Sequence, residues 1–66
     1  MLSQRELENL FTKTLKSARR RMADGDLENA TRRAAFASGL AAALDCPDKK
    51  MLTAELLSEL ALECDA

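Results

Sequence analysis

Residues 30–44, ATRRAAFASGLAAAL, decide how this chain folds, because the stretch is rich in alanine and carries no charge between Arg33 and Asp45. At about 100° per residue, a helix over residues 27–44 has two apolar faces. One face holds Leu27, Ala30, Ala34, Ala37, Ala41 and Leu44, and the second holds Phe36, Leu40 and Ala43. A helix that is apolar on so much of its circumference is usually buried from two sides. We therefore expect this helix to lie between two neighbours.

A first helix is expected over residues 3–23. Ser3 and Glu6 have the spacing of a capping box, in which side chains bind free backbone N–H groups at a helix start. The apolar residues then repeat at helical spacing on one face: Leu7, Leu10, Phe11, Thr14, Leu15, Ala18 and Met22. The opposite side is basic and holds Lys13, Lys16, Arg19 and Arg20.

Two short breaks separate the predicted helices. Gly25 suits the left-handed residue that ends a helix, and Asp26 is a good N-cap for the next one. Because this connection is short, the first two helices should be antiparallel neighbours. Pro47 ends the second break, and a third helix is expected over residues 48–64. Its apolar side holds Leu52, Leu56, Leu57, Leu60 and Cys64, with Cys64 as a small buried residue, while Leu62 falls among polar positions.

These patterns predict an all-α fold, an antiparallel helical hairpin with a third helix, as one domain over residues 1–66. A chain of this length buries only about 60 % of the surface that its unfolded form exposes. Twelve of its residues are alanine, which add little buried area each. We therefore expect a small three-helix bundle that gains stability as a homodimer, through whichever apolar face of residues 27–44 the third helix leaves uncovered.

The composition argues against an enzyme and against a cofactor or metal site. The sequence has no histidine, only two glycines and two cysteines, and no nucleophile motif or phosphate-binding loop. A helical rise of about 1.5 Å per residue would separate the Cys46 and Cys64 thiols by more than about 20 Å, too far for a disulfide. Reduced thiols, with neither a secretory signal nor a transmembrane segment in the pattern, predict a cytoplasmic protein.

Charge is divided unevenly along the chain. Residues 1–33 carry eight Lys/Arg and five Asp/Glu, a net charge of +3, whereas residues 34–66 carry two Lys and six Asp/Glu, a net charge of −4. The basic residues from Lys13 to Arg33 could form a solvated face, dock on an acidic protein, or bind DNA or RNA phosphates. The overall charge of −1 and the absence of Trp and Tyr for base stacking disfavour nucleic acid.

In layout the chain resembles two groups of small proteins. A basic first helix, a Gly25-Asp26 turn and an alanine-rich second helix are similar to the helical co-chaperones of type III secretion needle subunits. The chain also resembles small bacteriophage proteins that inhibit host regulators, so the resemblance implies a bacterial or phage source. The third helix after Pro47 departs from the two-helix co-chaperone pattern.

The sequence thus predicts a helical interaction module that binds and modulates, inhibits or chaperones a partner protein, with a small DNA- or RNA-binding regulator as the alternative. The candidate contact residues are basic side chains and uncovered apolar ones: Lys16, Arg19, Arg20, Arg33, Phe36, Leu40 and Leu44.

Overall fold

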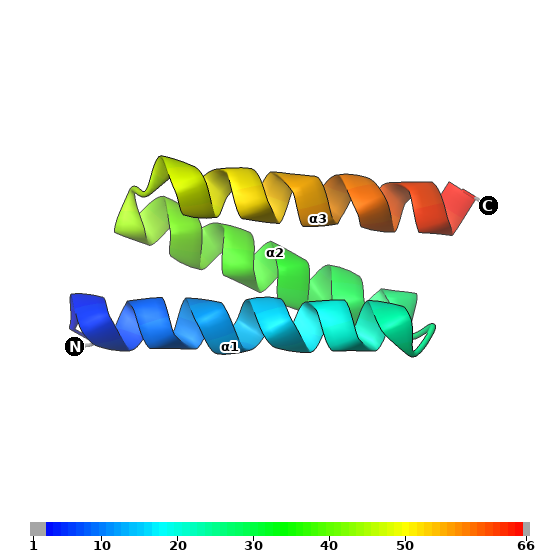
Figure 1. Ribbon diagram of the computed structural model, residues 1–66, viewed down its shortest axis with the longest axis horizontal. Helices are drawn as coiled ribbons and strands as arrows, with labels where there is room; N and C mark the ends of the chain where they lie inside the picture. The colour runs from blue at the N-terminus through cyan, green and yellow to red at the C-terminus, as the bar shows by residue number, and fades with distance from the viewer. Residues whose placement is uncertain (1–2, 66) are drawn as a thin grey trace.

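The computed structural model describes residues 3–65, and it consists of three helices with no strand in that range. They are α1 (Gln4–Ala23), α2 (Leu27–Leu44) and α3 (Pro47–Asp65). The chain runs along α1, returns along α2 and runs forward again along α3, so that α1 and α3 point the same way (Figure 1). The predicted all-α class with three helices is confirmed.

The Ser3 half of the predicted capping box is present at the start of α1. The Ser3 hydroxyl oxygen accepts a hydrogen bond of 3.2 Å from the Glu6 N–H at the start of α1. After α1, Gly25 has φ +84°, a left-handed conformation that strains residues with a Cβ. The Gly25 N–H donates to the Met22 carbonyl, and the Asp26 N–H donates to the Arg21 carbonyl. This tight turn makes α1 and α2 antiparallel neighbours.

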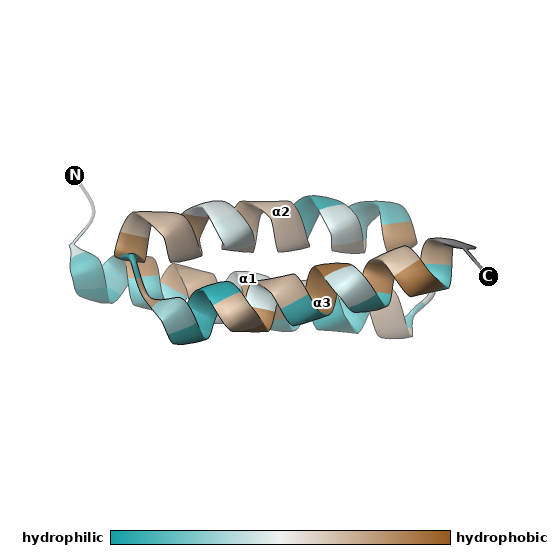
Figure 2. Ribbon diagram, turned by 90° about the horizontal axis from the view of Figure 1, so that it is seen from above, coloured by the Kyte–Doolittle hydropathy of each residue, from teal (hydrophilic) through white to brown (hydrophobic). Residues whose placement is uncertain are grey.

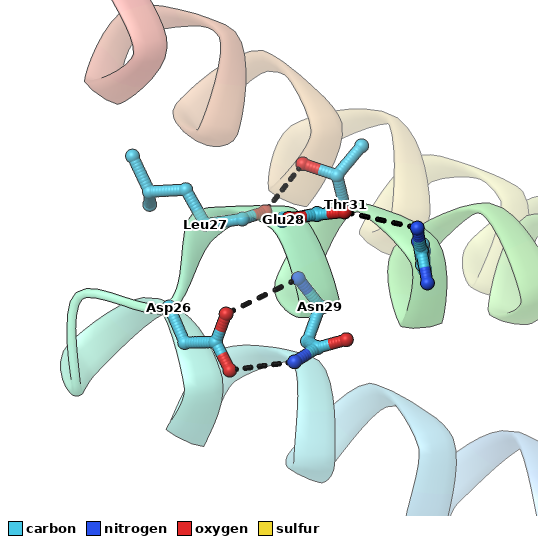
Figure 3. Close-up of polar contacts among 6 residues, drawn as sticks. Asp26, Leu27, Glu28, Asn29 and Thr31 are labelled. Atoms are coloured by element: carbon cyan, nitrogen blue, oxygen red, sulfur yellow. Dashed lines mark hydrogen bonds and ion pairs between the residues drawn. The ribbon is translucent and has the colours of Figure 1, made fainter.

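The start of α2 is fixed by Asp26 (Figure 3). Its carboxylate accepts hydrogen bonds from the Asn29 side-chain amide at 2.8 Å and from the Asn29 backbone N–H at 3.4 Å. Glu28 then pairs with Arg32 one turn later at 2.9 Å. The negative charge of Asp26 also lies at the positive end of the helix dipole, where it is stabilising.

This cap predicts a specific pH dependence of stability. The hydrogen bond from the Asn29 side chain lowers the pKa of Asp26 below its ordinary value. Because the pKa of Asp26 is lower in the folded chain than in the unfolded chain, where it is about 3.9, the ionised carboxylate stabilises the fold at pH values above about 3.9. This stabilisation is lost as the pH falls through the lower pKa of the folded state. In Asp26→Asn, the asparagine still caps the helix but cannot ionise. The natural chain should therefore be more stable than the variant near neutral pH. This difference in the free energy of unfolding should become smaller as the pH falls. Parallel pH curves from urea unfolding of the two chains would contradict this.

The turn between α2 and α3 contains a residue in a rare conformation. Asp45 has φ +51°, a left-handed geometry that glycine usually supplies at a helix C-terminus. Its carboxylate pairs with the Lys50 ammonium at 3.0 Å in the first turns of α3. The sequence indicated a break here, but not that Asp45 would take the left-handed position.

The core lies on one face of α2 and is made largely of alanine. One cluster joins all three helices and holds Ala18, Ala30, Ala34, Leu56 and Leu60. The second joins α1 to α2 and holds Phe11, Ala37, Leu40 and Ala41. Because alanines line the α2 side of both clusters, the neighbouring helices can approach its backbone closely.

The third helix does not cover the second apolar face predicted for α2, of which Phe36 and Ala43 stay exposed. Both α1 and α3 pack on the alanine face of α2, and Figure 2 shows α2 on one side of the molecule with α1 and α3 together on the other. Direct contact between α1 and α3 is sparse. It includes an ion pair of 3.7 Å between Arg19 and Glu59, and the Lys49 ammonium 5.8 Å from the centre of the Phe11 ring. The opposite side of α2 remains uncovered.

The buried side of α3 differs from its predicted apolar side. Cys64, expected to be buried, is exposed, and Leu52 is 39 % exposed. Thr53, which the apolar pattern omitted, is buried at 2 % exposure. Its hydroxyl donates to backbone carbonyl oxygens of the preceding turn, those of Lys49 and Lys50, so the polar atom is satisfied within the helix. This internal hydrogen bond is why a threonine can occupy a core position.

Candidate protein-interaction surface

The first candidate surface is the side of α2 that faces away from α1 and α3. Beyond the exposed Glu28–Arg32 ion pair near its start, this outer face is made of five exposed residues without charge: Ala35, Phe36, Gly39, Ala42 and Ala43. Phe36 stands out among them, with 54 % of its surface exposed. A Cβ atom added at Gly39 would meet no heavy atom within 4 Å, so no helix of the chain crosses there. The outer face is therefore an apolar strip of small side chains with one large side chain, that of Phe36.

The predicted apolar contact residues are divided between this surface and the core. Phe36 belongs to the outer face, whereas Leu40 is only 9 % exposed and packs in the cluster with Phe11. Leu44 is half-buried against the same cluster. Leu40 is thus a core residue, because α1 covers the flank of α2 from which it projects.

The second candidate surface is the basic side of α1. Lys13, Lys16 and Arg20 are exposed and share one side of α1 by their spacing. We call these three residues the basic surface. Within residues 3–64 none of them takes part in an ion pair, so no acidic side chain of that range neutralises their charges. A shallow depression at the end of α1, lined by Ser17, Arg20, Arg21 and Asp24, adjoins them.

Other basic residues are already paired inside the chain. Arg19 reaches Glu59 of α3 at 3.7 Å, and Arg21 reaches Asp26 at 3.7 Å. Arg32 pairs with Glu28. Of the four predicted basic contact residues, Lys16 and Arg20 therefore lie together, Arg19 turns toward α3, and Arg33 is exposed on α2.

The two outer helices carry opposite charge along their second halves. Between Glu8 and Asp24 all charged residues of α1 are basic, and after Lys50 all charged residues of α3 are acidic. Because α1 and α3 run in the same direction, the basic and acidic halves lie at the same end of the molecule (Figure 1). The molecule thus has one basic edge and one acidic edge.

Two apolar residues of α3 are exposed to a greater degree than Leu52. Met51 is 63 % exposed and Leu62 is 73 % exposed. The helical spacing placed Leu62 among polar positions, but it gave no indication that Met51 is exposed. Both stand among polar neighbours, and single exposed apolar side chains of this kind are common.

Comparison with known proteins adds no functional assignment. The chain matches no protein-family model, no curated protein and no solved structure. In the part of the chain that the structure describes, no helix is both long and apolar enough to cross a membrane. No group of three or more potential metal ligands comes together among the same residues.

Proposed function

We propose that this chain is a small helical protein–protein interaction module, which works as a homodimer in the cytoplasm. It binds a partner protein and modulates, inhibits or chaperones it. The observation that carries the proposal is the outer face of α2, which stays uncovered although all three helices are in place and carries no charge from Ala35 to Ala43. Exposed apolar strips with a large side chain are typical of association sites.

The basic surface supports a partner with acidic chemistry. Lys13, Lys16 and Arg20 project from one side of α1 without ion pairs to residues 3–64. Complementary charge of this kind speeds encounter and selects partners more than it adds affinity. An acidic protein surface is therefore the ligand that fits α1 best.

Retention of proteins from the native host tests this function. The immobilised natural chain is compared with the double variant Lys16→Glu, Arg20→Glu, which reverses two charges of the basic surface. The matched control is Glu55→Gln, Glu63→Gln, which changes two exposed charges on α3. We expect a protein retained by the natural chain and by the control to be lost from the basic-surface variant. If all three chains retain the same proteins, or none, the proposal is wrong.

A DNA- or RNA-binding regulator is the second candidate, favoured by the run of basic residues on α1. Pairing of Arg19, Arg21 and Arg32 with acidic residues of the chain reduces the charge available to phosphates. Fluorescence anisotropy with a labelled DNA duplex and a labelled RNA strand separates the two candidates. Phosphate binding predicts affinity that falls steeply with added salt. No binding at low salt would remove this alternative.

A further inference from the structure

We propose that α1 and α3 together bind a second copy of this chain, on the side of the molecule that faces away from α2. In this dimer, α1 of each copy lies on α3 of the other, about a two-fold axis parallel to the helices. The inference rests on the homodimer in the proposed function and gives it a surface and a direction. It leaves the outer face of α2, with Lys13 and Arg20 of the basic surface, to the partner protein.

The residues on this side can be identified from the contact between the two helices. Arg19 and Glu59 reach each other at 3.7 Å, while the sides of α1 and α3 that pack on α2 are apolar. At about 100° per residue, Lys16 lies about 60° from Arg19 and Glu55 about 40° from Glu59, in both cases turned further away from α2. By the same rotation, the α1–α3 face holds four exposed residues of each helix: Thr12, Lys16, Arg19 and Ala23 of α1, and Met51, Glu55, Glu59 and Leu62 of α3.

The α1–α3 face carries both apolar and charged side chains that the described chain leaves without partners. Met51 and Leu62 are the most exposed large apolar side chains within residues 3–64, at 63 % and 73 %. Lys16 and Glu55 form no ion pair in that range. Direct contact between α1 and α3 is sparse, and Figure 2 shows α2 only on the opposite side of the two helices. A second copy can therefore reach all four side chains.

The charged residues of the two copies meet in opposite pairs. Arg19 and Glu59 form an ion pair between α1 and α3, so they lie at the same height along these parallel helices. One turn before them lie Lys16 and Glu55, which are therefore level as well. A two-fold axis parallel to the helices preserves these heights. It brings Lys16 of each copy against Glu55 of the other, so that one symmetry operation forms both pairs.

The apolar residues of α3 meet small side chains of α1 by the same operation. Leu62 and Ala23 both lie one turn beyond the Arg19–Glu59 ion pair, and Met51 and Thr12 both lie about two turns before it. In the dimer, each of the two large side chains of α3 therefore packs on a small residue of the second copy. Each chain supplies two such side chains and receives two.

Charge selects the direction of the axis. A two-fold axis running across the helices would place α3 on α3 and set the acidic half of this helix against the same half of the other copy. The axis parallel to the helices places the basic half of α1 on the acidic half of α3, because both halves lie at the same end of the molecule (Figure 1). Like charges brought together disfavour an interface, so the parallel axis is preferred.

The extent of the α1–α3 face indicates a reversible dimer. Toward the other end of the two helices, Glu8 and Asp48 lie at about the same height and are both acidic, so contact is confined to residues 12–23 and 51–62. Twelve residues of a helix span about 18 Å at a rise of about 1.5 Å per residue. Two such segments fall below the area of about 1,200–2,000 Å² that stable interfaces bury. Association should therefore depend on protein concentration.

Sedimentation velocity and light scattering of the full chain test the dimer, at concentrations up to about 1 mM. Met51→Lys places an ammonium group against the basic half of α1 in the other copy and should raise the dimer dissociation constant by at least about tenfold. Phe36→Lys is the matched control, because it replaces a large exposed apolar residue on the outer face of α2, and it should leave the dissociation constant unchanged. Both side chains are more than half exposed, so the fold should survive, which circular dichroism verifies.

A charge swap tests the direction of the axis. Lys16→Glu and Glu55→Lys should each raise the dissociation constant several-fold, because each sets like charges against one another between the copies. The double variant should restore the dissociation constant, since every copy again meets an opposite charge. Urea unfolding of each variant at micromolar concentration reports any effect on the single chain. Without restoration, the pairing of α1 with α3 of the second copy is wrong.

Two results would overturn the dimer through this face. One is a natural chain that stays monomeric at every concentration, and the other is Met51→Lys associating as strongly as Phe36→Lys. Because Met51→Lys leaves the basic surface of α1 intact, it should still retain the partner protein, which separates loss of the dimer from loss of the partner. A monomeric chain that retains an acidic protein through Lys16 and Arg20 would contradict only this inference. A dimer that retains no protein would contradict only the proposed binding of a partner.

Discussion

Replacing Phe11 by alanine is expected to lower the free energy of unfolding by about 3–5 kcal/mol, the largest effect of any single truncation in this chain. Phe11 is 2 % exposed and packs against Ala37, Leu40 and Ala41. Two of these neighbours are alanines, whose methyl groups cannot move into the space that the ring leaves, so a cavity remains. A chain of 66 residues has a total stability of about 3–10 kcal/mol at typical values per residue. The variant should therefore lose about a third of this stability or more, and it should be largely unfolded if the natural chain lies at the lower end of the range.

Phe36→Ala is the matched control, because it makes the same chemical change at a position that is 54 % exposed. Measured by urea unfolding, it should change the free energy of unfolding by no more than about 0.5 kcal/mol. Equal losses in the two variants would contradict the burial of Phe11 on the alanine face of α2.

Replacing Leu56 by alanine should lower the free energy of unfolding by about 2–5 kcal/mol, because this truncation also leaves a cavity in the core. Leu56 has no exposed surface and lies in the cluster where α3 meets Ala18 of α1 and Ala34 of α2. It is one of the two buried leucines by which α3 is held in this cluster, the other being Leu60. Its loss should release α3 from the other two helices. Amide hydrogen exchange should then show the amides of α3 losing protection first.

Leu62→Ala serves as the control for Leu56, since Leu62 belongs to the same helix but is 73 % exposed. Its effect on the free energy of unfolding should stay within about 0.5 kcal/mol. If Leu62→Ala were as damaging as Leu56→Ala, the assignment of the buried side of α3 would be wrong.

Much of this fold can be predicted from local signals in the sequence. Ser3, Gly25, Asp26 and Pro47 each act within one turn of a helix end, so the breaks and caps can be predicted without knowledge of the packing. The alanine face of α2 is equally evident from its spacing. These features depend on backbone hydrogen bonds and rotation per residue, both of which are the same in every helix.

The arrangement of the helices around α2 could not be predicted in the same way. The two apolar faces of α2 left open whether the third helix or another chain would cover the second of them, whereas both α1 and α3 share the alanine face. The large side chains Phe11 and Leu56 pack where α2 offers mainly alanine methyl groups. The pairing of Arg19 with Glu59 likewise requires the two outer helices to be in place. For the candidate surfaces, the sequence identified Phe36 and the basic residues but placed Leu40 among them.

The sparse contact between α1 and α3 has a kinetic consequence. Nearly all tertiary contacts join helices that follow one another in the chain, across turns of a few residues. The loops that must close before contacts form are therefore short, and the entropy lost in closing them is small. Helical proteins with such a low contact order fold in microseconds to milliseconds. Either hairpin can form first on α2, and the remaining helix then adds to a surface that is already assembled.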